Sequence, residues 1–256
     1  MLKKLIHNLK TFQQQSAIIT AEALAGENVF CVCCDKSFIT FLPFGVVKRA
    51  NALCPNCHSL ERHRMHYHYM FHQTNLLNGQ SLKMLHVAPE IILYNKFIAN
   101  NAIDYVPCAK FGPGFSDQYD YPPKTVDVDI TEICFIDNEF DVIYCSHVLE
   151  HIPNDRKAME EFYRVLKPGG WSLLQVPLDI NLDKTYEDFS IINTAERKKA
   201  FGQWDHVRVY GKDYKDRLTE AGFEVRVERY TDSFSENDLF KYGFMKDEDI
   251  YLCKKH

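Results

Sequence analysis

The sequence lacks the long apolar run that a membrane span requires. No stretch approaches about 20 consecutive apolar residues, and the N-terminal MLKKLIHNLKTFQQQ has no uninterrupted apolar centre of the kind found in signal peptides. We therefore expect no transmembrane segment and a cytoplasmic location. A cationic excess is also missing, because the formal net charge is -5 over 256 residues. This balance argues against a surface that attracts nucleic acid as a whole, although it allows a local basic patch.

The length favours more than one folding unit, with a small module in front of a larger α/β domain. We expect a helix over 1–25, a zinc-ribbon-like module over 26–60, a linking helix over 61–79 and the α/β domain over 80–256. The helix carries an apolar stripe flanked by lysines, formed by Leu2, Leu5, Ile6, Leu9 and Phe12. Packing on its own domain or on a partner is the favoured role of this stripe, and a membrane surface is the alternative.

The nine cysteines are distributed unevenly. Cys31 and Cys34 form one CxxC pair, and Cys54 and Cys57 form another, a spacing typical of a zinc ribbon or treble-cleft site. Four thiolates would hold one Zn²⁺, and a small module with little core of its own would need that metal to fold. Cys33 is an alternative ligand in a strained CxC arrangement. The remaining cysteines lie in or beside apolar segments and are expected in the core: Cys108, Cys134, Cys145 and Cys253.

Histidines are concentrated directly after the second cysteine pair, in HSLERHRMHYHYMFHQ. A second metal site is one interpretation, but at helical spacing these histidines spread around several faces. A helix that links the cysteine module to the α/β domain is therefore favoured. Arg62, His63 and Arg64 could contact an anionic substrate from this helix.

The segment from Phe140 to Pro177 predicts two buried parallel strands joined by a helix. FDVIYCSH, residues 140–147, is a nearly continuous apolar run, as expected when helices cover both faces of a strand. Asn154 and Asp155 supply N-cap chemistry for the helix, which Pro168-Gly169-Gly170 ends before the strand 171–176. Ligands bind outside the carboxyl ends of such strands, so the polar residues after the first strand are candidates for a site: Ser146, His147, Glu150 and His151.

This segment resembles class I S-adenosylmethionine-dependent methyltransferases, in which "FD.I...VLEH" is followed by a helix and "LKPGG". The resemblance extends over about residues 80–256. Further blocks, NALCPNCHSLERHR, FLPFG and DHVRVYGKDYKDRLTEAGFEV, are similar to a bacterial subgroup that carries an N-terminal zinc ribbon. The resemblance implies an α/β, Rossmann-like, doubly wound sheet of seven strands with the last strand antiparallel. It also implies S-adenosylmethionine as cofactor and zinc as a structural metal.

The resemblance implies a cofactor site that departs from the family pattern in two places. The segment LKMLHVAPE, residues 82–90, has no GxGxG, so Ala88-Pro89 must make the turn before a helix that runs to about Asn100, and the side chains of His86 and Glu90 could replace the usual contacts. The strand 103–108 ends without the expected ribose-binding carboxylate. Asp104 lies at its other end, and Asp117 and Asp120 would require the following loop to fold back.

Two further strand ends are expected at the cofactor site. Asp129 and Ile130 end the strand 126–130, where an aspartate reads the adenine amino group, whereas Asp127 alternates to the other side. Ser146 and His147 end the next strand. Cofactor binding is therefore expected from these residues: His86, Ala88, Glu90, Asp129, Ile130, Ser146 and His147.

Three histidines are candidates for proton transfer. His147 and His151 follow a strand, and His206 lies in WDHVRVYG, which the family places near the substrate. HVLEH also matches the inverted zinc-peptidase motif HxxEH, but Pro153 disfavours the continuous helix that this motif needs. Some methyltransferases with ExxEH at this position bind a divalent cation that orients the acceptor hydroxyl. Here His147 replaces the first glutamate, and with Glu150, His151 and His206 it could still bind a metal.

We therefore expect a methyltransferase (EC 2.1.1.-) that transfers a methyl group from S-adenosylmethionine. The charged insert from Leu178 to Trp204 should help to form an acceptor pocket or lid. A small-molecule acceptor is favoured by the acidic net charge, while an RNA base or a protein side chain stays open. Two alternatives remain: a catalytically silent methyltransferase-like binding module, and an RNA methyltransferase that uses the zinc ribbon for recognition.

Overall fold

The computed structural model describes residues 15–76, 78–112 and 121–256, which fall into two compact units. The first unit combines the N-terminal part of the chain, up to Asn78, with the segment Arg229–Glu248. The second unit consists of Gly79–Glu228 and Asp249–His256. The apolar stripe predicted between Leu2 and Phe12 lies outside the described residues, and residues 15–23 are helical. Among the described residues, no helix is both long and apolar enough to cross a membrane.

The first unit contains two small antiparallel hairpins and three helical segments after residue 24. Strand β1 pairs with β2 and strand β3 pairs with β4. The buried side chains of this unit come from both parts of the chain that form it, including Val29, Phe38, Met65 and Leu239. The elements are β1 (Ala25–Cys31), β2 (Lys36–Phe38), β3 (Leu42–Phe44), β4 (Arg49–Leu53), α2 (Glu61–Gln73), η2 (Tyr230–Ser233) and α7 (Glu236–Tyr242).

The second unit is built on a seven-stranded sheet with the order β12-β13-β9-β8-β5-β6-β7. Neighbouring strands from β9 to β7 are parallel, and β13, the last strand of the chain, is antiparallel to both β9 and β12. The strands are β5 (Leu82–Val87), β6 (Ile103–Ala109), β7 (Val126–Asp127), β8 (Phe140–Ser146), β9 (Leu166–Gln175), β12 (Glu224–Glu228) and β13 (Ile250–Lys254). The predicted doubly wound, Rossmann-like fold is confirmed.

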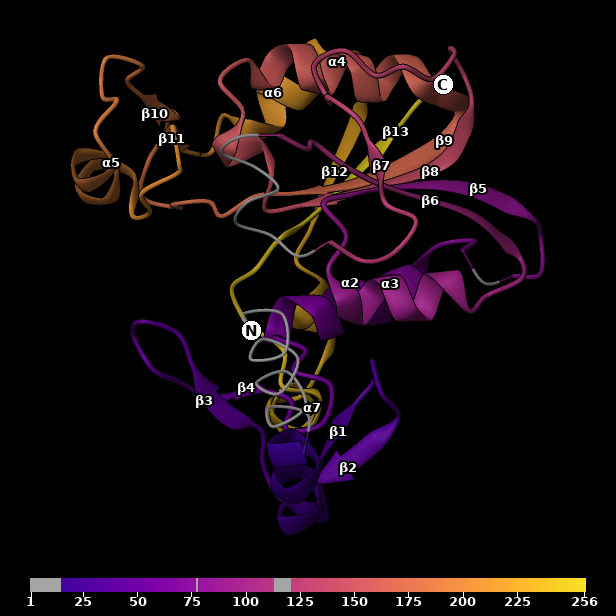
Figure 1. Ribbon diagram of the computed structural model, residues 1–256, viewed down its shortest axis with the longest axis vertical. Helices are drawn as coiled ribbons and strands as arrows, with labels where there is room; N and C mark the ends of the chain where they lie inside the picture. Colours follow the sequence, from indigo (N-terminus) through magenta and orange to yellow (C-terminus); the bar gives the residue numbers. More distant parts are fainter. Residues whose placement is uncertain (1–14, 77, 113–120) are drawn as a thin grey trace, which may run out of the picture. The chain divides into compact units, whose positions relative to one another are not determined.

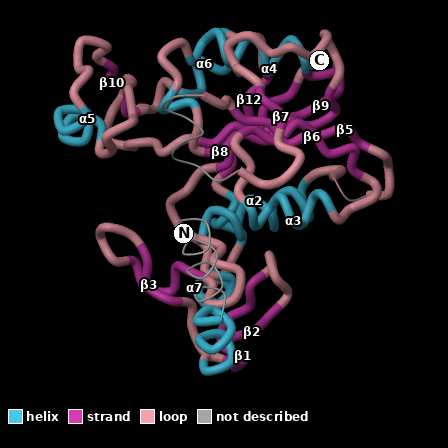
Figure 2. The backbone as a smooth tube through the Cα atoms, in the orientation of Figure 1, coloured by secondary structure: helices cyan, strands magenta, loops and turns pink. Residues whose placement is uncertain are grey.

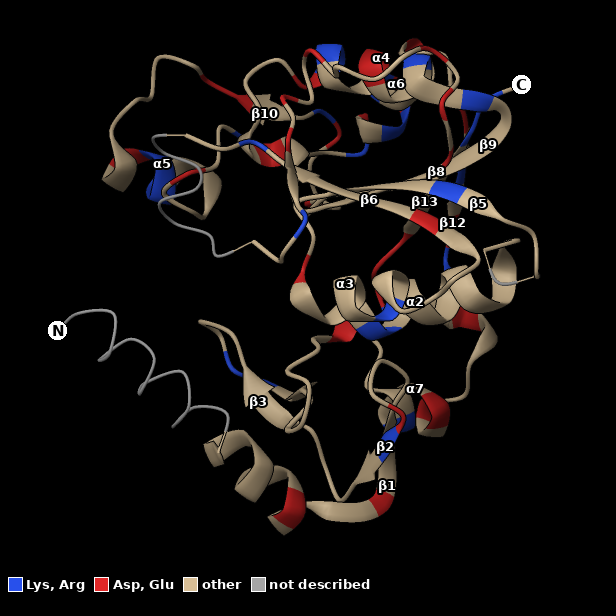
Figure 3. Ribbon diagram, turned by 45° about the vertical axis from the view of Figure 1, so that its right-hand side comes forward, with Lys and Arg blue, Asp and Glu red and all other residues tan. Residues whose placement is uncertain are grey.

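Helices cover both faces of this sheet, as the apolar strands require. Figure 1 shows α4 (Asp155–Val165) and α6 (Tyr214–Glu220) over one face and α3 (Ile91–Ile98) on the other. Asn154 caps α4 by accepting a hydrogen bond from the Lys157 N–H, as its sequence position predicts. Acidic and basic residues are interspersed along α4 and α6 (Figure 3), and Arg156 of α4 forms an ion pair with Glu220 of α6.

Three sequence expectations about this unit need correction. Strand β7 ends at Asp127 instead of residue 130, because the side chain of Asp129 turns the chain by accepting a hydrogen bond from the Thr131 N–H. Strand β9 begins at Leu166 instead of residue 171. Cys134 is exposed, whereas Cys108, Cys145 and Cys253 are buried as expected.

The insert between β9 and α6 is mostly loop (Figure 2), with the short strands β10 (Tyr186–Glu187) and β11 (Arg208–Val209) and the helix α5 (Thr194–Phe201). Strands β10 and β11 pair antiparallel, so the two ends of the insert are held together. Several large apolar side chains of the insert are exposed, among them Phe189 and Ile192.

The turn between β5 and α3 has a backbone that usually requires glycine. Ala88 has a φ of 47°, in the left-handed region, and its N–H donates to the carbonyl of Cys108 on the neighbouring strand. A residue with a Cβ atom loses about 1–2 kcal/mol in this conformation. The chain therefore keeps a glycine-like turn without the glycine that the family pattern led us to expect.

We expect Ala88→Gly to leave the free energy of unfolding unchanged or to raise it by up to about 1 kcal/mol, because relief of strain outweighs or balances the entropy that glycine adds to the unfolded chain. The control Ala158→Gly, inside helix α4, should lower it by about 1 kcal/mol or more. Both tryptophans, Trp171 and Trp204, lie in the second unit, so urea unfolding followed by tryptophan fluorescence reports on this unit. Equal destabilisation by the two changes would contradict the strain.

Candidate functional site

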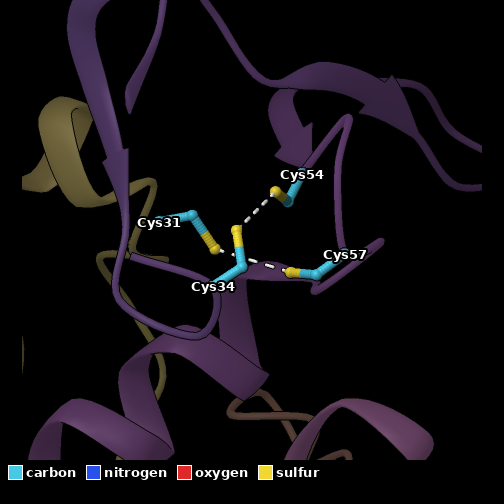
Figure 4. A group of neighbouring side chains, drawn as sticks. All are labelled: Cys31, Cys34, Cys54 and Cys57. Atoms are coloured by element: carbon cyan, nitrogen blue, oxygen red, sulfur yellow. Dashed lines mark hydrogen bonds between the residues drawn. The ribbon is translucent and has the colours of Figure 1, made fainter. Parts of the chain in front are cut away.

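The first candidate site is a cluster of four cysteines in the first unit. The sulfur atoms of Cys31 and Cys57 lie 3.7 Å apart, as do those of Cys34 and Cys54 (Figure 4). Four sulfurs at about 2.3 Å from a tetrahedral zinc ion lie about 3.8 Å from one another. The two observed distances match this value, and all four sulfurs lie within 4.8 Å of one another, so the cluster fits a metal ion of this size. No other described cysteine belongs to the cluster.

Two tight turns bring these sulfurs together. In the first turn, Asp35 donates its N–H to the Cys31 carbonyl, and in the second, His58 donates to the Cys54 carbonyl. Asp35 and His58 both have positive φ values, 55° and 60°. The close packing of the thiols lowers the pKa of Cys31, because neighbouring thiols, first that of Cys33, donate hydrogen bonds to its sulfur, and it raises the pKa of Cys34 and Cys54, which share their protons with Cys31. Such a deprotonated sulfur is the form that binds metal.

Arg64 supports this cluster from helix α2, and its position overturns the expectation that it contacts a substrate. Its side chain is fully buried. The guanidinium donates to the carbonyls of Ser59 and Ala52 beside the second turn and to those of Tyr242 and Gly243 at the C-terminal end of α7. Its cation therefore acts electrostatically on the ligand sulfurs of Cys31 and Cys54, and it joins the two chain segments of this unit.

The second candidate site lies at the carboxyl ends of the parallel strands in the second unit. Strand β8 ends at Ser146, and the 3-10 turn η1 (Leu149–His151) follows directly. The Ser146 hydroxyl is buried and has no hydrogen-bond partner among the described residues. His147 has a φ of 55°, a strained value for a residue other than glycine. His147 lies outside an α-helix and His151 lies in η1, so HVLEH does not have the helical form that the peptidase motif requires.

Glu150, His151 and His206 come together at this edge. One ligand atom from each lies within 4.8 Å of the other two, and the rings of His151 and His206 meet edge to face with centroids 4.7 Å apart. Burial lowers the pKa of His206 to about 4 and also lowers that of His151, which Asp205 partly opposes. Both rings are therefore neutral at pH 7. His147, the third predicted histidine, has its Nδ1 3.6 Å from Glu150 Oε1, but it is not a member of this group.

A buried network of charges positions this group. The guanidinium of Arg208 is fully buried and donates to the carbonyls of Leu149, Ile152 and Pro153, which surround η1. Its Nε also donates to Glu187 in the insert. Asp155, at the start of α4, accepts from Tyr210 and Arg217. The network therefore fixes η1, the first turn of α4 and the insert relative to one another.

The predicted cofactor residues lie at the ends of β5, β7 and β8. His86 is fully buried, with Nδ1 2.8 Å from the Tyr105 hydroxyl and Nε2 3.2 Å from Glu90 Oε2. Both ring nitrogens therefore have protein partners, and what His86 offers a ligand is the orientation of the Glu90 carboxylate. Ala88 makes the strained turn between them. Ile130 is buried beside Asp129.

Asp129 keeps one carboxylate oxygen for a ligand. Its Oδ1 accepts from the N–H and the hydroxyl of Thr131, at 2.9 and 2.6 Å, and these bonds hold the pKa of the carboxyl below its usual range. Its Oδ2 accepts no hydrogen bond within the described part of the chain. Asp117 and Asp120 lie outside the described residues. A carboxylate that we did not predict lies beside the end of β6: Asp127 pairs with Ala109 and accepts from the Phe111 N–H at 2.8 Å.

Sequence reasoning also missed Asp205 and the buried positions of Arg208 and Asp155 at this edge, although Arg208 was considered as an anchor for the segment before α6. Asp205 Oδ2 lies 3.3 Å from His151 Nδ1. The only available signal was adjacency, since Asp205 and Arg208 flank the predicted His206 in WDHVRVYG. Asp155 was interpreted as part of an N-cap, but its carboxylate is buried among Tyr210, Arg208 and Arg217.

Part of the second unit is similar in sequence to known proteins. Residues 100–174 match a sequence model described as a methyltransferase domain. The ubiquinone/menaquinone biosynthesis C-methyltransferase UbiE of Brucella canis is 37% identical over 115 residues, which cover 39% of this chain and 42% of that protein. The UbiE of Vibrio cholerae is 30% identical over 112 residues, 39% of this chain and 43% of that protein. The chain thus spans about two fifths of the length of these relatives.

Among solved structures, the YcgJ protein of Bacillus subtilis is 14% identical with a TM-score of 0.47, covering 75% of this chain and 100% of that one. A putative methyltransferase of Bacillus halodurans is 18% identical with a TM-score of 0.42, covering 69% of this chain and 93% of that one. The fold assignment rests on the strand order and not on these likenesses. Residues 100–174, which match the methyltransferase-domain model, include strands β6, β7 and β8 and most of β9 of the seven-stranded sheet.

Proposed function

We propose that the protein is an S-adenosylmethionine-dependent methyltransferase that acts on a small molecule and carries a structural zinc ion in its first unit. The observation that supports this proposal most is the edge of the sheet where β5, β7 and β8 end, because it combines the family match with polar groups that have capacity for a ligand. Those groups are the buried Ser146 hydroxyl and Asp129 Oδ2. An orphaned buried hydroxyl costs about 1–3 kcal/mol unless a ligand bonds it.

In this proposal, the residues at the three strand ends hold the cofactor. Glu90, oriented by His86, would accept from its ammonium group. Asp129 would bind the adenine amino group beside Ile130. Asp127 would bind the ribose hydroxyls in place of the carboxylate that β6 lacks. Ser146 and the backbone at Ala88 and His147 would line the part of the site that surrounds the sulfur of the cofactor. When bound, S-adenosylmethionine supplies a methyl group on a sulfonium, which an acceptor displaces in line.

The protein's own contribution to such a reaction is mainly alignment and exclusion of water. His147 is the candidate for proton removal from the acceptor, because its side chain is 31% exposed at the edge and its backbone is held in a strained conformation. His151 and His206 are more enclosed, and both stay in our set of candidate catalytic residues. The insert, with Phe189 and Ile192 exposed, is the proposed acceptor lid.

The small-molecule acceptor is supported by the names of the curated relatives, which are C-methyltransferases of quinone biosynthesis. Because those matches cover only part of each chain, we use them only to decide which acceptors to test first. An acceptor screen should begin with phenolic and quinone-like small molecules and continue with RNA and protein acceptors. Methylation at carbon ends with loss of a proton, which would give His147 a role.

Cofactor binding tests the proposal first. We expect S-adenosylmethionine and S-adenosylhomocysteine to bind the wild-type chain in an isothermal titration, and Asp129→Ala to weaken both by at least about tenfold, since a hydrogen bond to a charged group contributes about 1.5–3 kcal/mol. Asp104→Ala is the matched control, because Asp104 lies at the amino end of β6 with a 66% exposed side chain. If neither ligand binds the wild type, the enzyme proposal fails and the silent binding module takes its place.

Zinc in the cysteine cluster is tested separately. We expect one zinc ion per chain to be released when a mercurial reagent modifies the thiols, and Cys54→Ser to abolish this release and to unfold the first unit, because its small core depends on the metal. Cys33→Ala is the control: Cys33 is buried next to Cys31 but lies outside the cluster, so its zinc should be retained. Loss of zinc from both variants alike would refute the ligand set.

A further inference from the structure

The second unit brings together three side chains of the types that bind metal ions, two of which, His151 and His206, are also candidates for proton transfer. We propose that Glu150, His151 and His206 form a binding site for one divalent transition-metal ion, separate from the cysteine cluster. Glu150 and His151 belong to η1, and His206 comes from the far end of the insert. One ligand atom from each lies within 4.8 Å of the others. Ligand atoms about 2.0–2.2 Å from zinc lie about 3.5 Å apart. Side-chain rotations that move these atoms by about 1 Å would therefore close the site.

The outer nitrogens of both histidines are held by acceptors of the protein. His151 Nδ1 lies 3.3 Å from Asp205 Oδ2 and 3.4 Å from the Asp205 carbonyl. The His206 ring is hydrogen-bonded to the backbone of Phe201. Metal-binding histidines almost always donate their second N–H to a carboxylate or a backbone carbonyl, which fixes the ring and the tautomer. Both histidines of this group have that outer support.

The second nitrogen of each ring, Nε2 of His151 and of His206, then carries a lone pair that is directed at the group. His206 is only 5% exposed, and its Nε2 is buried without a hydrogen-bond partner among the described residues. His151 Nε2 lies 3.9 Å from Glu150 Oε1, which is longer than a hydrogen bond. A buried nitrogen without a partner is costly in a purely structural cluster. A metal ion placed between the three side chains would remove that cost.

The carboxylate adds the charge that such an ion needs. Glu150 is 1% exposed, and buried carboxylates are stable when they are paired or when they bind a metal. Its Oε1 lies 3.6 Å from His147 Nδ1 and 3.9 Å from His151 Nε2, so the carboxylate faces both rings. Arg208 fixes the backbone on both sides of η1, so Glu150 and His151 are presented on a rigid support.

Two imidazoles and one carboxylate select borderline ions such as Zn²⁺, Co²⁺ or Fe²⁺ over Mg²⁺ and Ca²⁺, which prefer oxygen ligands. Three protein ligands leave at least one coordination position open. An oxygen donor would fill it, and if the proposed function holds, a hydroxyl or carbonyl of the acceptor is the donor class that this position would take. Metal binding itself does not depend on that function and can be tested without cofactor or acceptor.

The test is a calorimetric titration of Zn²⁺ into the full chain after the cysteine cluster has been filled. Its thiols should then be unreactive toward a chromogenic reagent, which shows that the cluster is closed. We expect one further equivalent of Zn²⁺ to bind the wild type without release of thiols. The variants His206→Phe and Glu150→Gln should weaken this second binding by more than about tenfold. Asp205→Asn, which removes the carboxylate that supports His151 and keeps the size of the side chain, should weaken it by about 10–100-fold.

Matched controls separate this site from surface binding. His256→Gln removes an exposed histidine that pairs with Glu224, and Asp188→Asn removes an exposed carboxylate of the insert, so neither should change the second equivalent. His206→Phe keeps a buried ring and removes the ligand atom, and thermal unfolding of each variant checks that it folds. Added Zn²⁺ should raise the Tm of the wild type and leave that of His206→Phe unchanged.

The proposal is overturned if the filled wild type binds no further Zn²⁺, or if His206→Phe and Glu150→Gln bind it as the wild type does. Loss of the second equivalent in His256→Gln would assign it to the surface and would also overturn the proposal. Failure of S-adenosylmethionine to bind in the separate titration would refute the methyltransferase function but not this site. The two hypotheses therefore fail on different measurements.

Discussion

The buried guanidinium of Arg208 is the interaction on which the candidate active edge depends. It donates to three backbone carbonyls around η1 and to Glu187 in the insert, and its side chain has no exposed surface. Its ion pair with Asp155 is also buried, and loss of one partner from such a pair costs about 3–5 kcal/mol, because the charge left behind cannot reach water. Arg217 and Asp155 extend the network to α6 and α4. The loop that carries Glu150 and His151 is therefore as well supported as the helices, although it contains only one short 3-10 turn.

The sequence predicted the parts of this edge that follow from periodicity. Apolar runs such as FDVIYCSH identify buried strands. The rule that ligands bind at the carboxyl ends of parallel strands then locates Ser146, His147, Glu150 and His151 from the sequence alone. The spacing of the four cysteines was equally informative, because tetrahedral zinc imposes a local geometry on two short turns. These features are predictable because they depend on residues close together in the chain.

The features that escaped prediction depend on contacts between distant segments. Asp205 supports His151 across 54 residues, and no periodicity connects the two. Arg64 was considered as a substrate contact, but it is buried against the carbonyls of Tyr242 and Gly243. That contact brings Arg229–Glu248 into the first unit, although the sequence placed this segment in the α/β domain. A buried arginine is recognisable only when the acceptors that surround its five N–H donors are known.

Two residues at the carboxyl ends of neighbouring strands have strained backbones. Strands β5 and β8 are parallel neighbours, and the residues that follow them, Ala88 and His147, both have left-handed backbones with φ values of 47° and 55°. Each costs about 1–2 kcal/mol that glycine would not cost. Strain of this kind persists where the surrounding structure determines the conformation, and it is concentrated at functional sites. Two strained residues lie side by side here, next to a Ser146 hydroxyl that has no hydrogen-bond partner in the described ranges. An edge built to receive a ligand explains them better than stability does, because stability alone would favour glycine at both positions.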